Sequence, residues 1–218
     1  MERSGLRLQL MKQQALAGDI VLLFADESEA LTHPHPSPGL LVSLRVQADR
    51  VKGSPYLARA WAKRGADLRV EAPGQSQKIA MMGALDFVSR QLTVVTSQTK
   101  RSADFIAMLE RLDQIHGPKP GAACKPVIIA LDNGPIHTSK ATRAALEARK
   151  HWLTPEWLAK YAPELNDIER DWKTIKAHHL AHKTFENRDS LQATIETEIQ
   201  AINSSRKNQP LAKQRISA

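Results

Sequence analysis

Three acidic residues, far apart in the sequence, each lie beside a pattern that fixes the backbone around them. Asp26 follows the apolar run of residues 20–25, and Asp132 follows a second apolar run, residues 127–131. Continuous apolar runs of this length are typical of strands buried on both faces. Glu169 lies near the start of a segment with helical spacing. We therefore expect two carboxylates to be held by strands and one by a helix, which are rigid supports for a site.

Carboxylates in such positions are suited to divalent metal chemistry. A carboxylate is a hard anionic oxygen ligand for Mg²⁺ or Mn²⁺, and two ions about 3.5 to 4 Å apart stabilise both oxygens of an in-line phosphoryl displacement. This chemistry needs no Ser, Cys or His nucleophile. The residue types thus indicate metal-dependent phosphodiester chemistry, with two Mg²⁺ (or Mn²⁺) ions per active site.

The chain resembles DDE-superfamily transposases, in their mariner-related insertion-sequence branch, in the segments FADES, LDNGPIH and YAPELNDIERDWKTIK. The likeness runs from about Asp19 to Lys176 and is weaker in its middle part. It implies an α/β fold, namely a ribonuclease-H-like mixed β-sheet flanked by α-helices. It also implies that Asp26, Asp132 and Glu169 are the catalytic, metal-binding acids of an enzyme that cleaves DNA at element ends and joins those ends to target DNA.

The sequence departs from the family pattern in three respects. Asp167 stands where the family usually has Pro, and the 36 residues between Asp132 and Glu169 make a slightly long spacing. Family members usually carry a helix-turn-helix module ahead of this domain, which we expect to be separate or missing here. Two alternatives stay open: an inactive truncated remnant that binds DNA or a partner without cutting, or a non-transposing nuclease of the same fold.

Composition favours a nucleic-acid partner. The 31 Lys and Arg residues exceed the 23 Asp and Glu residues, which gives a net charge of +8 in 218 residues. Such a charge favours a polyanion, and no basic amphipathic helix points to a membrane. Cys124 is the only cysteine, so neither an intramolecular disulfide nor a Cys-rich zinc site can form. We expect a cytoplasmic protein that is nucleoid-associated when bound to DNA, with a homodimer as a further expectation.

The chain divides into three parts on its patterns. Residues 1–18 read as an N-terminal helix or linker remnant ended by Gly18, residues 19–204 as the catalytic domain, and residues 205–218 as a basic, flexible tail. Within the domain we expect two strands, residues 79–87 and 91–96, joined by a tight turn. We also expect a helix over residues 102–116 with Ser102 as its N-cap, a helix over residues 139–150, and a last helix from Asn187 onward.

Each acid has a competing interpretation. Glu27 could replace Asp26, but neighbouring side chains of a strand point to opposite faces, so only one of them can face the site. Asp132 belongs to an Asp-Asn-Gly-Pro turn, which is compatible with a role in the site. Glu169 could instead form a capping box with Asn166, using its carboxylate on the helix start.

Other polar residues near these acids are candidates for DNA contact. Asn133 and His137 follow Asp132 closely, although His137 could equally make a hydrogen bond at a helix start. At about 100° per residue, Lys173 and Lys176 share a helical face with Glu169. Lys160 lies among aromatic residues that could stack on unpaired bases. We therefore predict DNA contacts at Asn133, His137, Lys160, Lys173 and Lys176.

Overall fold

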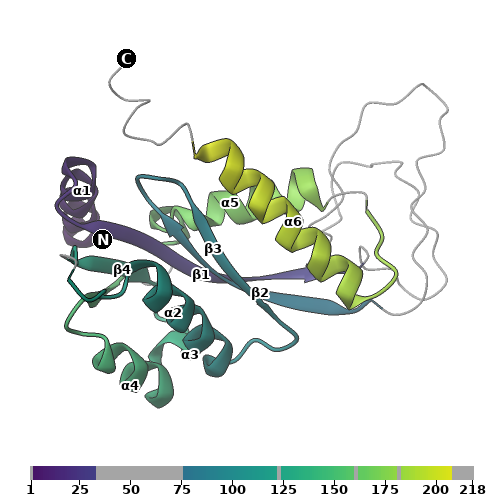
Figure 1. The fold of residues 1–218 in the computed structure, drawn as a ribbon, viewed down its shortest axis with the longest axis horizontal. Helices are drawn as coiled ribbons and strands as arrows, with labels where there is room; N and C mark the ends of the chain where they lie inside the picture. The colour runs from purple at the N-terminus through teal and green to yellow at the C-terminus, as the bar shows by residue number, and fades with distance from the viewer. Residues whose placement is uncertain (1, 33–75, 122–123, 160–161, 181–182, 208–218) are drawn as a thin grey trace.

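The computed structural model describes residues 2–32, 76–121, 124–159, 162–180 and 183–207. A five-stranded mixed sheet lies between two layers of helices (Figure 1). Its strands are β1 (Val21–Leu31), β2 (Lys78–Asp86), β3 (Leu92–Ser97), β4 (Val127–Leu131) and β5 (Leu153–Trp157). The spatial order is β3-β2-β1-β4-β5. The pairs β1–β2 and β2–β3 are antiparallel, whereas β1–β4 and β4–β5 are parallel, as the predicted ribonuclease-H-like sheet requires.

Helices cover both faces of this sheet. They are α1 (Glu2–Ala17), α2 (Ser102–His116), α3 (Pro135–Thr138), α4 (Lys140–Ala148), α5 (Ile168–Thr174) and α6 (Arg188–Arg206). A 3-10 turn, η1 (Pro163–Leu165), precedes α5, and a π-helical turn, η2 (Ile175–His179), continues it. None of the helices in the described ranges is long and apolar enough to cross a membrane.

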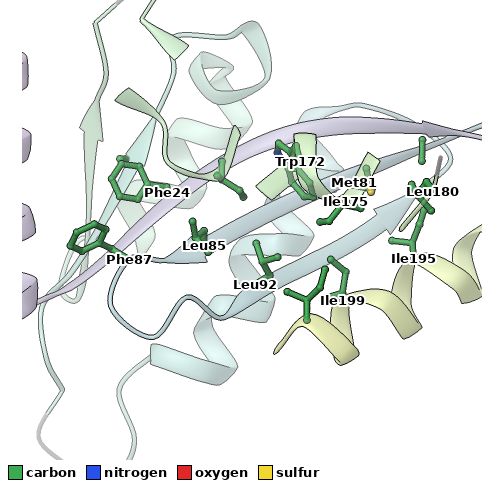
Figure 2. Packing of buried hydrophobic residues seen from close by; sticks show 14 of the residues in the cluster. Phe24, Met81, Leu85, Phe87, Leu92, Trp172, Ile175, Leu180, Ile195 and Ile199 are labelled. Carbon is green, nitrogen blue, oxygen red and sulfur yellow. The ribbon is translucent and has the colours of Figure 1, made fainter. Parts of the chain in front are cut away.

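Alternation along the central strands divides the core into two layers. Leu22 and Phe24 of β1 face α1, α5 and α6, where they join a cluster that contains Trp172 and the apolar stripe of α6 (Figure 2). Leu23 and Ala25 face α2 instead. Both faces of β1 are therefore buried, which explains its continuous apolar sequence.

The terminal helices belong to this core. In α1 the buried residues Leu8, Met11 and Ala15 pack on the sheet, and the helix ends before Gly18, whose φ is +85°. A left-handed residue after the last helical turn is the conformation that glycine supplies without strain. The predicted start of the last helix is also confirmed, because Asn187 is its N-cap and accepts from Ser190 N. Its predicted apolar stripe is buried, with Leu191, Ile195, Ile199 and Ile202 in the core.

Several predicted boundaries were wrong. β1 continues to Leu31, so Asp26 lies within the strand and does not end it. The N-cap of α2 is Arg101, not Ser102, because the carboxylate of Asp104 accepts the backbone N–H of Arg101 at 2.8 Å. The helix α6 extends to Arg206, beyond the predicted limit of the domain. The rest of the expected basic tail, residues 208–218, lies outside the described residues.

Candidate active site

The pairing of β1 with β2 decides which way Asp26 and Glu27 point. Asp26 pairs with Gly83, and a Cβ atom at Gly83 would lie 2.5 Å from the indole of Trp172 in α5. Position 83, and with it Asp26, is therefore on the α5 face of the sheet. Glu27 pairs with Met82, which belongs to the core layer beneath α2. Asp26 shares its face with Glu169, and Glu27 faces the opposite layer.

Asn166 ties the start of α5 to β1. Its side-chain amide is buried and donates to the carbonyl oxygen of Ala25 at 3.2 Å, next to Asp26. The predicted capping box was wrong: the helix begins at Ile168, and the backbone carbonyl of Asn166 accepts from Glu169 N at 3.1 Å. The side chain of Asn166 thus makes a long-range contact in place of a local cap. The carboxylate of Glu169 remains available on the first turn.

Asp132 follows the last residue of β4 and is held from one side. Its Oδ1 atom accepts from Gly134 N at 2.9 Å and lies 2.6 Å from Nδ1 of His137. The hydrogen bond from His137 is the largest influence on the pKa of Asp132, which is lowered below its ordinary value. Half of the Asp132 side chain is exposed, at 51%. An ionised and accessible carboxylate therefore stands at the carboxyl end of β4.

Glu169 and Asp132 are both close enough to Asp26 for their charges to act on it. The pKa of Asp26 is raised to about 7, chiefly by burial and by the neighbouring charge of Glu27. The charges of Glu169 and Asp132 contribute smaller parts of this shift. Mutual repulsion between carboxylates is what a divalent cation would relieve, and hard oxygen donors suit Mg²⁺ or Mn²⁺. In the described part of the chain, however, no three His, Cys, Asp or Glu side chains converge tightly enough to hold a metal ion as they stand. Donor chemistry and charge fit the cation, and binding requires the carboxylates to move together.

Glu27 and His137 lie behind this group on the α2 side. Nε2 of His137 is 3.2 Å from Oε2 of Glu27, and the other oxygen of Glu27 is 3.3 Å from Nζ of Lys100. Burial alone would lower the pKa of His137, but the hydrogen bond to Asp132 and the charge of Glu27 raise it overall. Neither Lys100 nor this role of Glu27 was predicted, since both depend on contacts between distant segments.

The predicted DNA contacts occupy different environments, and His137 is fully buried, so its side chain is not exposed for a DNA contact. Lys176 is half-buried near the acids: burial lowers its pKa, and the charges of Glu169 and Asp26 oppose that shift. Lys173 is exposed on α5. The side chain of Asn133 donates to the carbonyl oxygen of Leu158 at 2.7 Å and so joins the end of β4 to the segment after β5. Lys160 lies outside the described residues.

Asp167, the residue in place of the family's Pro, turns away from the acids. Its carboxylate pairs with Nζ of Lys12 in α1 at 3.0 Å. The same ammonium group lies 5.1 Å from the ring centroids of Phe24 and Phe87. This contact fixes α1 against the start of α5, and the helix start itself is intact.

Comparisons with known proteins give concordant results. The model of the family described as DDE superfamily endonuclease matches residues 48–192, which contain Asp132 and Glu169 but not Asp26. Over 122 residues the chain is 30% identical to the insertion element IS630 uncharacterized 39 kDa protein of Shigella sonnei. That match covers 56% of this chain and 34% of the relative, so the chain spans about a third of the relative's length.

Two solved structures of Mos1 transposase have a similar fold. The paired-end complex with the left transposon end has a TM-score of 0.57 and 18% identity, covering 91% of this chain and 52% of that one. The mariner paired-end complex with Mn has a TM-score of 0.56 and 17% identity, covering 94% and 55%. At these identities the likeness concerns the fold, and it confirms the predicted ribonuclease-H-like sheet flanked by helices.

Proposed function

The chain belongs to the family of DDE superfamily endonucleases, and we propose that it is the catalytic domain of a transposase. In this proposal it cleaves DNA strands at the ends of a mobile element and joins the freed ends to target DNA. The similarities to the IS630 protein and to the Mos1 fold agree with the mariner-related insertion-sequence branch. The single observation that carries the proposal is that Asp132 and Glu169, which are distant from Asp26 in sequence, both lie close enough for their charges to act on Asp26.

In the proposed mechanism Asp26, Asp132 and Glu169 would hold the divalent cations. Bound cations supply positive charge that lowers the pKa of water and stabilises the oxygens of an in-line displacement. The protein's part is to place the carboxylates: β1 carries Asp26, Asp132 directly follows β4, and Asn166 fixes the helix that carries Glu169. Lys100 and Lys176 add positive charge beside the acids, where the phosphates of DNA would lie.

Strand transfer uses the same side chains with a different nucleophile. In the first step water attacks the scissile phosphorus atom and a 3′ oxygen leaves. In the second step the freed 3′-hydroxyl attacks a phosphate of target DNA and the 3′ oxygen of the broken target strand leaves, so no covalent protein intermediate is expected. DNA is therefore the principal partner, and a helix-turn-helix module and a second copy of the chain are further partners that we propose from the family resemblance.

A nearly isosteric substitution tests this function. Asp132→Asn should abolish Mg²⁺- or Mn²⁺-dependent nicking of plasmid DNA, because the amide cannot replace an anionic ligand, while DNA affinity and the fold are retained. Glu164→Gln is the matched control, since Glu164 is an exposed acid in η1. Metal-dependent nicking retained by purified Asp132→Asn would overturn the proposal.

One observation favours a second candidate, a remnant that binds DNA without cutting. The acids in the described residues are not drawn together into a closed metal site. Titration with Mn²⁺ separates the two: saturable binding at millimolar concentration or below supports the enzyme, and no binding supports the remnant. Joining of a pre-cut 3′-hydroxyl duplex to a second DNA separates a transposase from a nuclease of the same fold.

A further inference from the structure

His137 lies between the carboxylates of Asp132, which follows β4, and Glu27, which lies in β1. Its Nδ1 atom is 2.6 Å from Oδ1 of Asp132, and its Nε2 atom is 3.2 Å from Oε2 of Glu27. The imidazole side chain is fully buried, at 0% exposure, whereas the Asp132 side chain is 51% exposed. A buried ring therefore contacts the accessible acid from inside the protein.

The surroundings of the ring fix its orientation. The phenyl ring of Phe105 in α2 lies 4.6 Å from the imidazole centroid at an angle of 59°. His137 is itself part of α3, which begins at Pro135, so the backbone links Asp132 and His137 through one short turn. Packing of this kind restricts rotation of the ring about its side-chain bonds. The position of Nδ1 is then set by the core and not by solvent.

The two contacts of the ring differ in quality. The bond from Nδ1 to Asp132 is short and well formed, and because an ionised carboxylate only accepts, Nδ1 is the donor. The contact of Nε2 with Glu27 is within ion-pair distance, but neither Nε2 nor Oε2 has a well-aligned hydrogen bond among the described residues. Asp132 is therefore the main partner of the ring, and Glu27 holds the ring from the opposite side.

We propose that His137, supported by Glu27, is a positioning residue that fixes the carboxylate of Asp132 for metal binding. The remaining hydrogen bond to Oδ1, from Gly134 N, comes from the same side. Both donors bind the same oxygen, so Oδ2 keeps its capacity for a cation. This role is of the type in which a group outside the metal ligands orients a ligand and tunes its affinity. It rests on the proposed function of Asp132.

The contacts of the His137 ring with Asp132 and with Glu27 can be separated by substitution. His137→Gln retains an amide near the former Nε2 atom and loses the donor to Asp132. His137→Asn retains an amide near the former Nδ1 atom and loses the contact with Glu27. We expect His137→Gln to weaken Mn²⁺ binding about 10-fold, and His137→Asn to recover part of that loss, because it keeps the donor to Asp132 but lacks the support of Glu27. Binding is measured by the free Mn²⁺ signal in electron paramagnetic resonance, which needs no turnover.

A matched control and a second variant keep the test decisive. His179→Gln removes another histidine whose Nδ1 atom lies 2.6 Å from a carboxylate, that of Glu198 in α6, and should leave Mn²⁺ affinity unchanged. If both His137 variants unfold, Glu27→Gln is used, and a weaker Mn²⁺ affinity without loss of secondary structure supports the same role.

The outcomes also separate this inference from the proposed function. Failure of the wild-type chain to bind Mn²⁺, or retained binding and cleavage by Asp132→Asn, would remove the function on which the inference rests. If Asp132→Asn loses binding but both His137 variants bind Mn²⁺ as tightly as the wild type does, His137 fills space only and the positioning role is overturned. If they unfold and Glu27→Gln binds as the wild type does, the role is overturned as well.

Discussion

Gly83 lies directly beneath the indole ring of Trp172. A methyl group at position 83 would come within 2.5 Å of Cζ2 of that ring and within 3.2 Å of Cδ1 of Ile168. Figure 2 shows Trp172 among the buried side chains that cover this face of the sheet. Because Gly83 pairs with Asp26, the absence of a side chain lets α5 approach the strand that carries Asp26. Close contact of helix and sheet is thus a condition for bringing Glu169 towards Asp26.

Gly83→Ala is therefore expected to displace α5. Overpacking of a well-packed core costs about 1 to 3 kcal/mol in the free energy of unfolding, and the shift of α5 should weaken Mn²⁺ binding as well. Urea unfolding and Mn²⁺ titration measure the two effects. Gly5→Ala is the control, since nothing lies within 4 Å of a Cβ atom there and Gly5 is helical. Unchanged stability of Gly83→Ala would show that Trp172 can move without cost.

Asp26→Asn should stabilise the protein in the absence of metal. The pKa of Asp26 is raised from 3.8 to about 7 in the folded protein, first by burial and then by Glu27. The folded state therefore binds the proton more tightly, and ionised Asp26 lowers stability as the pH rises from about 4 to about 7. An amide removes this loss. In chelator, the free energy of unfolding of Asp26→Asn should exceed that of the wild type by roughly 1 to 3 kcal/mol at pH 8.

The pH dependence and the response to metal check this explanation. The advantage of Asp26→Asn should be smaller at pH 5 than at pH 8, because folded Asp26 is protonated at the lower pH. Added Mn²⁺ should stabilise the wild type and leave the variant unchanged. A variant that is less stable than the wild type at pH 8 without metal would contradict the assigned cause of the raised pKa.

The fold was predictable to the extent that it depends on local patterns. The five-residue apolar run of β4 and the α6 stripe are each buried as their periodicity indicates. The choice between Asp26 and Glu27 could not be predicted from local patterns, because it depends on which residue of β2 pairs with each of them. Alternation along the strand shows that Asp26 and Glu27 point to opposite faces of the sheet. Only the pairing of Asp26 with Gly83 shows that α5 covers the face of Asp26.

Local rules were misleading where a distant partner competes with a local one. Asn166 and Glu169 have the spacing of a capping box, yet the amide of Asn166 donates to Ala25, 141 residues away along the chain. A buried carbonyl without a donor costs more than an uncapped helix start that solvent can reach. The acids themselves were placed by their neighbours in sequence, whereas Lys100 and Asn166 carry no local signal of their position beside the site.

Asn166→Ala tests whether the hydrogen bond from Asn166 to Ala25 positions α5 or only buries a side chain. Loss of the amide leaves the carbonyl oxygen of Ala25 without this donor, which should cost about 1 to 3 kcal/mol, and it frees the start of α5 to move. Mn²⁺ affinity should fall together with stability. Asn203→Ala is the control, because its amide bonds the backbone of Leu92 at 2.8 Å in both directions on another part of the sheet. Equal Mn²⁺ affinities of the two variants would refute a positioning role for Asn166.

Asp167→Pro should be tolerated at the start of α5. The φ of Asp167 is −59°, which is the value that a proline ring imposes. The substitution removes the ion pair with Lys12, and because both side chains are partly exposed, the loss should be at most about 1 kcal/mol. Lys12→Met removes the same pair from α1 while keeping an unbranched side chain over Phe24 and Phe87. Similar small losses in both variants, with unchanged Mn²⁺ affinity, would assign Asp167 to the contact with α1. A marked loss of Mn²⁺ binding in Asp167→Pro alone would instead show that Asp167 supports the site through the conformation of Asn166.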